Sequence, residues 1–136
     1  MTEYIASLLL LGITAAKDIR EKKISVRIII AFACGAVLYH MILGSFSFGK
    51  TAANMLPGCL LMLLSVLTRE SIGYGDGILV MTLGLWAGGW FALAVTVIGI
   101  MLAGIYGAIC LLQKKNEPIP FAPFLLLGME VLLLYV

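Results

Sequence analysis

The chain has 136 residues, of which 62% are hydrophobic and only 12% are charged, whereas soluble domains usually contain about a quarter charged residues. Nine Lys or Arg and seven Asp or Glu residues are too few to cover the surface of a soluble domain of this length. The composition therefore predicts a membrane protein and excludes a soluble enzyme, a secreted module and a disordered segment. The net charge of +2 provides no basic stripe, so we expect no nucleic-acid partner.

The N-terminal stretch 1–16 is apolar, but it contains Glu3 where a signal peptide would have basic residues. Charged residues at 18–23 follow this stretch in place of a small-residue cleavage site. We therefore expect it to be retained as the first membrane span.

Polar residues divide the chain into six apolar segments, which we expect to be transmembrane helices. The uncharged run 77–112 would be roughly 54 Å long as a single helix, far more than the approximately 30 Å hydrocarbon core of a bilayer. It must turn, and Gly88-Gly89 is the expected place, with Trp86 and Trp90 on either side. The six segments are Tyr4–Ala16, Ile24–Leu43, Thr51–Leu67, Ile78–Ala87, Trp90–Leu112 and Phe121–Val136.

The basic residues lie almost entirely in alternate loops. With six spans, eight of the nine fall on one side and only Lys50 falls on the other. The positive-inside rule makes the first side cytoplasmic and places both termini outside. The sequence thus predicts an all-α membrane protein in which residues 1–136 form one polytopic bundle of six transmembrane helices. The eight residues are Lys17, Arg20, Lys22, Lys23, Arg27, Arg69, Lys114 and Lys115.

The sequence contains no metal-binding motif. Its three cysteines, Cys34, Cys59 and Cys110, lie in separate apolar stretches without a C-x-x-C pair, and His40 is the only histidine. We therefore expect neither a metal site nor a cofactor. His40 falls near the outer end of the second span, where an interfacial role is favoured over a catalytic one.

Two aspartates adjoin apolar segments that are too short to cross a bilayer alone. Residues 4–16 would cover only about 20 Å and residues 78–87 only about 15 Å. The first helix must therefore continue past Asp18 toward Arg20, and the fourth must begin before Asp76. Both carboxyls then lie at cytoplasmic helix ends, at or below the membrane boundary, where ionisable groups are candidates for function.

Two carboxylates that meet cannot both ionise at low cost, so one holds a proton while the other accepts one. Aspartic proteases activate water against a peptide bond in this way. Around Asp76, glycines at alternate positions predict backbone freedom that would let an extended substrate lie close. The alternative is a flexible loop in which Asp76 merely caps the fourth helix. For Asp18, the alternative is an ordinary pairing with its basic neighbours.

Three segments occur in a characteristic order. They are Asp18-Ile19-Arg20 followed by Lys22-Lys23-Ile24, then Gly73-x-Gly75-Asp76, and finally Ile119-Pro120-Phe121-Ala122-Pro123-Phe124. In order and spacing they resemble the type IV prepilin peptidases, the GxGD class of membrane aspartyl proteases. The resemblance covers essentially the whole chain.

This resemblance implies that Asp18 and Asp76 are the catalytic pair. The implied substrate is a prepilin or pseudopilin precursor, whose short basic leader is cut after a glycine at the cytoplasmic membrane boundary. The implied location is the plasma (inner) membrane of a prokaryote, surrounded by lipid and with the active site facing the cytoplasm. The supporting motif positions are Gly73, Gly75, Gly77, Arg20, Lys23, Pro120 and Phe121.

The chain also departs from the family pattern. Ser25-Val26 follows Ile24 where the family often has Pro-Asn, and Ile78 stands where a Lys is common two residues after the second Asp. Longer family members carry a cytoplasmic insertion with two zinc-binding C-x-x-C pairs, which is linked to N-methylation of the pilin. This sequence has no such insertion, so we expect peptidase activity alone.

Small residues at four-residue spacing, Gly99, Ala103 and Gly107, predict close helix packing within the bundle or, alternatively, between two copies of the chain. Glu130, inside the sixth segment, has no role in the peptidase interpretation. Two rival functions remain at this stage. One is a small proton-coupled transporter that uses the intramembrane carboxylates, and the other is a non-catalytic membrane scaffold.

Overall fold

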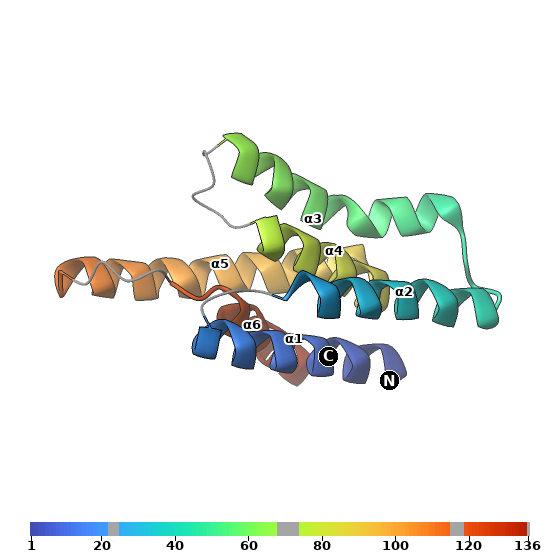
Figure 1. Cartoon of the computed structure of the whole chain (residues 1–136), viewed down its shortest axis with the longest axis horizontal. Coiled ribbons are helices and arrows are strands. Elements are labelled where there is room, and N and C mark those ends of the chain that lie inside the picture. Colours follow the sequence, from blue (N-terminus) through green and yellow to red (C-terminus); the bar gives the residue numbers. More distant parts are fainter. Residues whose placement is uncertain (22–24, 68–73, 115–118, 136) are drawn as a thin grey trace.

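A computed structural model of the chain describes residues 1–21, 25–67, 74–114 and 119–135. These residues form six helices, which lie roughly side by side as a bundle (Figure 1). The all-helical prediction is confirmed. The helices are α1 (Thr2–Glu21), α2 (Val26–Ile42), α3 (Phe48–Leu67), α4 (Tyr74–Ala87), α5 (Gly89–Leu112) and α6 (Ala122–Tyr135).

The helix boundaries confirm the predictions made from the short apolar segments. Helix α1 continues past Asp18 and ends at Glu21, and α4 has already begun at Tyr74, before Asp76. The break between α4 and α5 falls at Gly88, whose φ of 95° lies in the region that glycine adopts without steric cost. The uncharged run therefore turns at the predicted position.

Helix α4 is the central element of the bundle. It packs against α1, α2, α3 and α5, and eight of its 14 residues are buried. A single apolar core surrounds it, to which α1 contributes Leu10, α5 contributes Val95 and α6 contributes Leu125. The central position explains why α4 shows little amphipathic pattern, since a helix that is covered on most sides is apolar all round.

Glycines allow α3 and α4 to approach closely. A Cβ atom added to Gly58 of α3 would lie 2.7 Å from the carbonyl oxygen of Gly77, and one added to Gly77 would lie 3.3 Å from the carbonyl oxygen of Gly58. Gly84, seven residues beyond Gly77 and thus two turns along the same face of α4, lies against the backbone of Asn54. Small residues bring helix backbones together in the same way in membrane proteins.

The small-residue stripe of α5 packs inside the bundle. A Cβ atom at Gly99 would lie 3.1 Å from the Leu125 side chain, and one at Gly107 would lie 3.1 Å from the Ile119 side chain. Packing within the bundle is therefore confirmed as one use of this stripe, and pairing between two copies stays a prediction.

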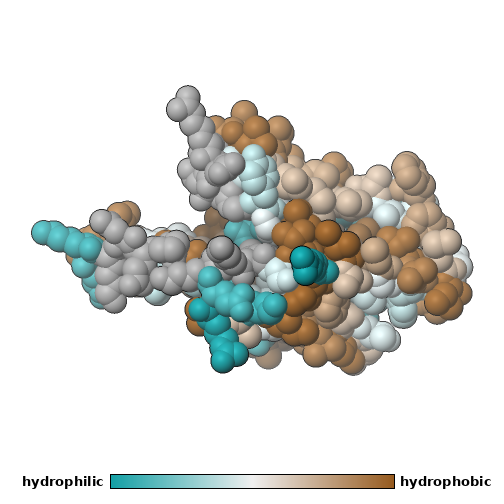
Figure 2. All heavy atoms as spheres, in the orientation of Figure 1, coloured by the Kyte–Doolittle hydropathy of each residue, from teal (hydrophilic) through white to brown (hydrophobic). Residues whose placement is uncertain are grey.

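The outer surface of the bundle is strongly apolar. Leu60 on α3 and Leu112 on α5 are 59% and 86% exposed, and hydrophobic side chains cover much of the flank (Figure 2). Exposed apolar surface of this extent is typical of contact with lipid. Helices α3 and α5 are each long and apolar enough to cross a membrane by length and composition.

Most of the described basic residues lie toward one end of the bundle, where hydrophilic side chains are visible in Figure 2. Lys17, Arg20 and Lys114 lie where α1 and α5 end, and Arg27 lies where α2 begins, whereas Lys50 lies in the first turn of α3 at the opposite end (Figure 1). This distribution agrees with the predicted asymmetry. The other basic residues fall outside the described residues; they are Lys22, Lys23, Arg69 and Lys115.

Candidate active site

Asp18 and Asp76 lie at the same end of the bundle, one near the end of α1 and the other in the first turn of α4 (Figure 1). Their two helices pack against each other. The side chains are only 7% and 8% exposed. The structure thus brings both predicted catalytic residues to one end of the molecule and buries both.

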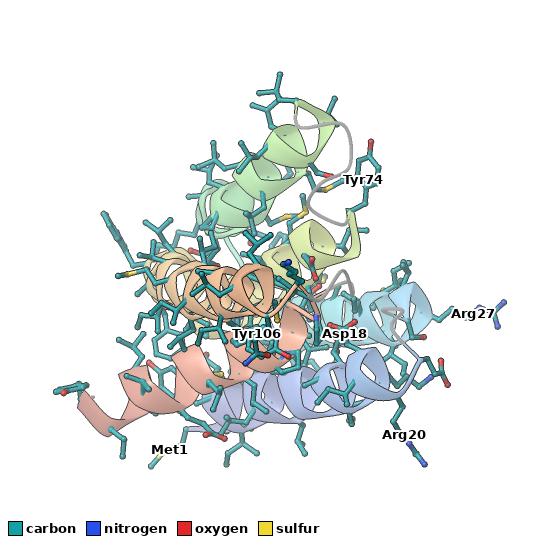
Figure 3. The ribbon with its side chains drawn as sticks, turned by 90° about the vertical axis from the view of Figure 1, so that its left-hand side faces the viewer. Met1, Asp18, Arg20, Arg27, Tyr74 and Tyr106 are labelled. Atoms are coloured by element: carbon teal, nitrogen blue, oxygen red, sulfur yellow. The ribbon has the colours of Figure 1, made fainter. Side chains whose placement is uncertain are left out.

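The burial of Asp18 follows from the periodicity of α1. Leu11, Thr14 and Ala15 form a buried stripe at helical spacing, and Asp18 is the next residue on this face. Arg20, two positions further, lies on another face and is exposed. Seen from this end of the bundle, Asp18 lies among the helices, whereas Arg20 and Arg27 point outward (Figure 3). Arg20, the one described basic residue that follows Asp18 on α1, therefore does not cover its carboxyl group.

Asp76 lies inside α4 on its buried side, together with Leu79, Val80 and Leu83. Asp76 is therefore part of the first turn of the helix and not of a loop before it. The expectation of a flexible backbone is wrong for Gly75 and Gly77, because both are helical. Gly77 instead removes a side chain at the contact with α3. Its role in the motif is close packing, which holds the first turn of α4 against its neighbour.

The start of α6 supplies a hydrogen bond to Asp18. The Oδ2 atom of Asp18 accepts the backbone N–H of Ala122 at 3.3 Å, although the two residues are far apart in sequence. The carbonyl oxygen of Phe121 accepts the first bonds of α6, from Phe124 and Leu125. The Ala122 N–H precedes these bonds and has no acceptor within the helix, so it is available to a carboxylate. A helix N-terminus also favours a negative charge.

The other supporting positions lie at different distances from this site. Phe121 packs against the apolar core, and Pro120 precedes it in the segment that leads into α6. Their placement agrees with a shaping role. Gly73 and Lys23 lie outside the described residues. Within the described ranges, no group of three or more His, Cys, Asp or Glu residues could hold a metal ion.

Comparison with known proteins supports an assignment to a family. The sequence profile of the type IV leader peptidase family matches residues 5–109, a range that includes both aspartates. The chain belongs to this family. Members of the type IV leader peptidase family thus share the part of the chain from α1 to α5, whereas the start of α6 lies beyond the matched range.

Curated relatives are longer than this chain. The prepilin leader peptidase/N-methyltransferase of Aeromonas hydrophila is 32% identical over 111 residues, which cover 74% of this chain and 38% of that protein. The protein of the same name from Stutzerimonas stutzeri is 39% identical over 71 residues, which cover 49% of this chain and 24% of that protein. The chain therefore matches less than half the length of these relatives. No solved structure matches it significantly.

The bond from Ala122 to Asp18 is a feature of this family member that sequence reasoning missed. Pro123 is the second residue of α6. A proline is tolerated in the first turn of a helix because its missing N–H would have no acceptor there. That pattern marks a helix start, and a helix start marks free N–H groups. The sequence therefore contained the donor, but only the fold identifies Asp18 as its acceptor.

We expect Ala122→Pro to destabilise the protein by about 1.5–3 kcal/mol, the usual contribution of a hydrogen bond to a charged group. Proline removes the N–H but suits the first position of a helix. Ala122→Gly keeps the N–H and is the matched control. The free energy of unfolding, measured in detergent, should fall more for Pro than for Gly.

A double-mutant cycle with Asp18→Ala separates the hydrogen bond from crowding by the proline ring. If Ala122→Pro costs as much with Ala at position 18 as with Asp, the hydrogen bond contributes nothing to stability. A smaller cost in the Asp18→Ala background is the expected result.

Proposed function

We propose that this chain is a membrane aspartic endopeptidase that removes the short basic leader of type IV prepilin or pseudopilin precursors. The observation that carries the proposal is the burial of Asp18 and Asp76 at one end of the bundle, on two helices in contact, in a chain of the type IV leader peptidase family. The names of the curated relatives support the same substrate class.

The proposed reaction uses one ionised and one protonated carboxyl. The ionised Asp takes a proton from water, whose oxygen attacks the carbonyl carbon, while the protonated Asp donates to the carbonyl oxygen. Breakdown of this intermediate returns a proton to the leaving amine and breaks the peptide bond. The first turn of α4 holds Asp76 and the first residue of α6 contacts Asp18. Partial positive charge at both helix N-termini favours the one negative charge that the pair carries.

We further propose that the six helices all cross the plasma (inner) membrane of a prokaryote, with both termini outside and the aspartates on the cytoplasmic side. The basic residues near the ends of α1 and α5 support this orientation through the positive-inside rule. A substrate leader that is itself basic stays on the same side. Its cleavage point then lies at the cytoplasmic membrane boundary, next to the end of the bundle where both carboxyls are buried.

Helices α4 and α6 have 14 residues each and are about 21 Å long, shorter than the roughly 30 Å hydrocarbon core. This difference supports a site recessed from the membrane surface. The central helix α4 is covered by its neighbours, so its polar first turn is shielded from lipid.

The test is co-expression with a candidate prepilin from the same genome. The mass of the precursor in isolated membranes is compared for wild type, the double variant Asp18→Asn/Asp76→Asn and an empty vector. We expect loss of the leader only with wild type. If several precursors with basic leaders stay uncut beside a folded, membrane-inserted wild-type protein, the proposed peptidase function is wrong, and proton-coupled transport becomes the function to test.

A further inference from the structure

Two adjoining cavities lie at the end of the bundle opposite the aspartates. There, α1 and α3 begin and α2 ends (Figure 1). One cavity, of about 250 Å³, is lined mostly by polar side chains, among them Glu3, Lys50 and Thr51. The other, of about 340 Å³, lies between α3 and α5 and is lined mostly by apolar side chains, among them Leu60 and Leu93. The proposed catalytic site uses neither.

Asn54 lines both cavities and forms the boundary between them. Its Oδ1 accepts the backbone N–H of Gly89 at 2.9 Å, so the contact between α3 and the start of α5 is fixed at this point. A Cβ atom on Gly89 would lie 3.0 Å from Cα of Asn54. The amide oxygen of Asn54 is used in this contact, so the part of its side chain that can bind a ligand is the NH₂ group, which donates hydrogen bonds.

The polar cavity contains one positive and one negative side chain. Lys50 lies in the first turn of α3, and Glu3 lies in the first turn of α1. The His40 ring is engaged in the fold, since Nε2 lies 2.9 Å from the carbonyl oxygen of Leu85 and Nδ1 lies 3.1 Å from Oγ of Ser45. Lys50 and Glu3 therefore supply the charges that a ligand in this cavity would meet.

The apolar cavity suits a hydrocarbon chain. Leu56, Leu60 and Leu93 line it along α3 and α5, each of which is long and apolar enough to cross a membrane by length and composition. Trp90, at the rim beside Gly89, is 87% exposed. An exposed Trp near a helix end is typical of the boundary between lipid tails and head groups. The polar cavity thus adjoins the apolar cavity in the same way that the polar head group of a lipid adjoins its apolar acyl chains.

We propose that this end of the protein binds one phospholipid with a zwitterionic head group of the phosphatidylethanolamine type. The ammonium group of Lys50 binds the phosphate, Glu3 binds the ammonium group of the lipid, and an acyl chain lies in the groove beside Leu60 and Leu93. Charge complementarity selects the head group. The phosphate of an anionic lipid would pair with Lys50, but its head group has no positive charge to pair with Glu3. A zwitterionic head group pairs with both side chains. The site is independent of the proposed peptidase function.

The test is native mass spectrometry of the full chain in detergent, with phosphatidylethanolamine or phosphatidylglycerol of the same acyl composition added at equal concentration. We expect about fivefold more retention of phosphatidylethanolamine, as for one additional partly exposed ion pair. Glu3→Gln should remove that preference, because only the ammonium group pairs with Glu3. Lys50→Gln, which loses the partner of the phosphate in both lipids, and Leu93→Trp, which fills the apolar groove, should each reduce retention of both lipids. Soluble phosphoethanolamine, which has no acyl chain, should show no retention.

Matched controls remove the same charges elsewhere. Lys114 lies at the other end of the bundle, and Glu130 lies on the exposed side of α6. The variants Lys114→Gln and Glu130→Gln should therefore bind both lipids as wild type does. Equal retention of the two lipids, a preference for phosphatidylglycerol, or unchanged binding in Lys50→Gln and Glu3→Gln would each overturn the proposal. The readout requires no peptidase activity, so this result stands apart from the test of the proposed function.

Discussion

Asp18→Asn and Asp76→Asn, each made alone, will reduce leader cleavage by about a thousandfold or more, because removing either proton-transfer group disables the pair. Asn has nearly the same shape as Asp but cannot exchange the proton that the reaction requires. Both side chains are almost fully buried, so no exposed neighbour can replace them easily. The measurement is the initial rate of leader loss from a purified precursor, followed by mass, at equal amounts of each folded variant.

Glu130→Gln is the control for this result. Glu130 is a third carboxylate in an apolar helix, but it is exposed on α6. We expect its cleavage rate to stay within about twofold of wild type, as for a surface substitution away from the reacting groups. Substantial cleavage by either Asp variant would contradict the two-aspartate mechanism. Loss of cleavage in Glu130→Gln alone would transfer the catalytic role to a residue that the peptidase proposal leaves unused.

The helices of this protein could be predicted from its sequence because local patterns determine them. Apolar segments too short for a membrane required α1 to extend beyond Asp18 and α4 to start before Asp76, and both helices do so. The turn at Gly88 followed from the length of the uncharged run. Charge asymmetry then placed both aspartates at one end, where the structure has them (Figure 1).

The contacts between helices could not be predicted, because they join residues that are distant in sequence. The pattern of alternate glycines around Asp76 indicated a flexible backbone, but Gly75 and Gly77 are helical. Gly77 is small because it touches α3, and the sequence does not state which helix is its neighbour. The acceptor of the Ala122 N–H was hidden for the same reason, since Asp18 meets α6 only in the folded bundle.

Gly84→Ala is expected to cause the largest loss of stability among the glycine substitutions, about 2–4 kcal/mol, because overpacking a tight helix contact forces the backbone to move. A Cβ atom at this position would overlap the carbonyl oxygen of Asn54 and lie 3.0 Å from its carbonyl carbon. Backbone atoms cannot rotate away as a flexible side chain can. The change must therefore separate α3 from α4, whose contact also includes Gly58 and Gly77.

Gly104→Ala is the matched control for Gly84→Ala. Gly104 lies in the interior of α5, and a Cβ atom there would meet nothing within 4 Å. Replacing a helical glycine in open space should stabilise the protein by about 0.5–1 kcal/mol, because alanine loses less backbone entropy on folding. The two variants make the same chemical change and should shift the thermal midpoint in detergent in opposite directions. Equal midpoints would mean that α3 does not press on α4 at Asn54, and the close glycine contact would then have no part in holding Asp76 in place.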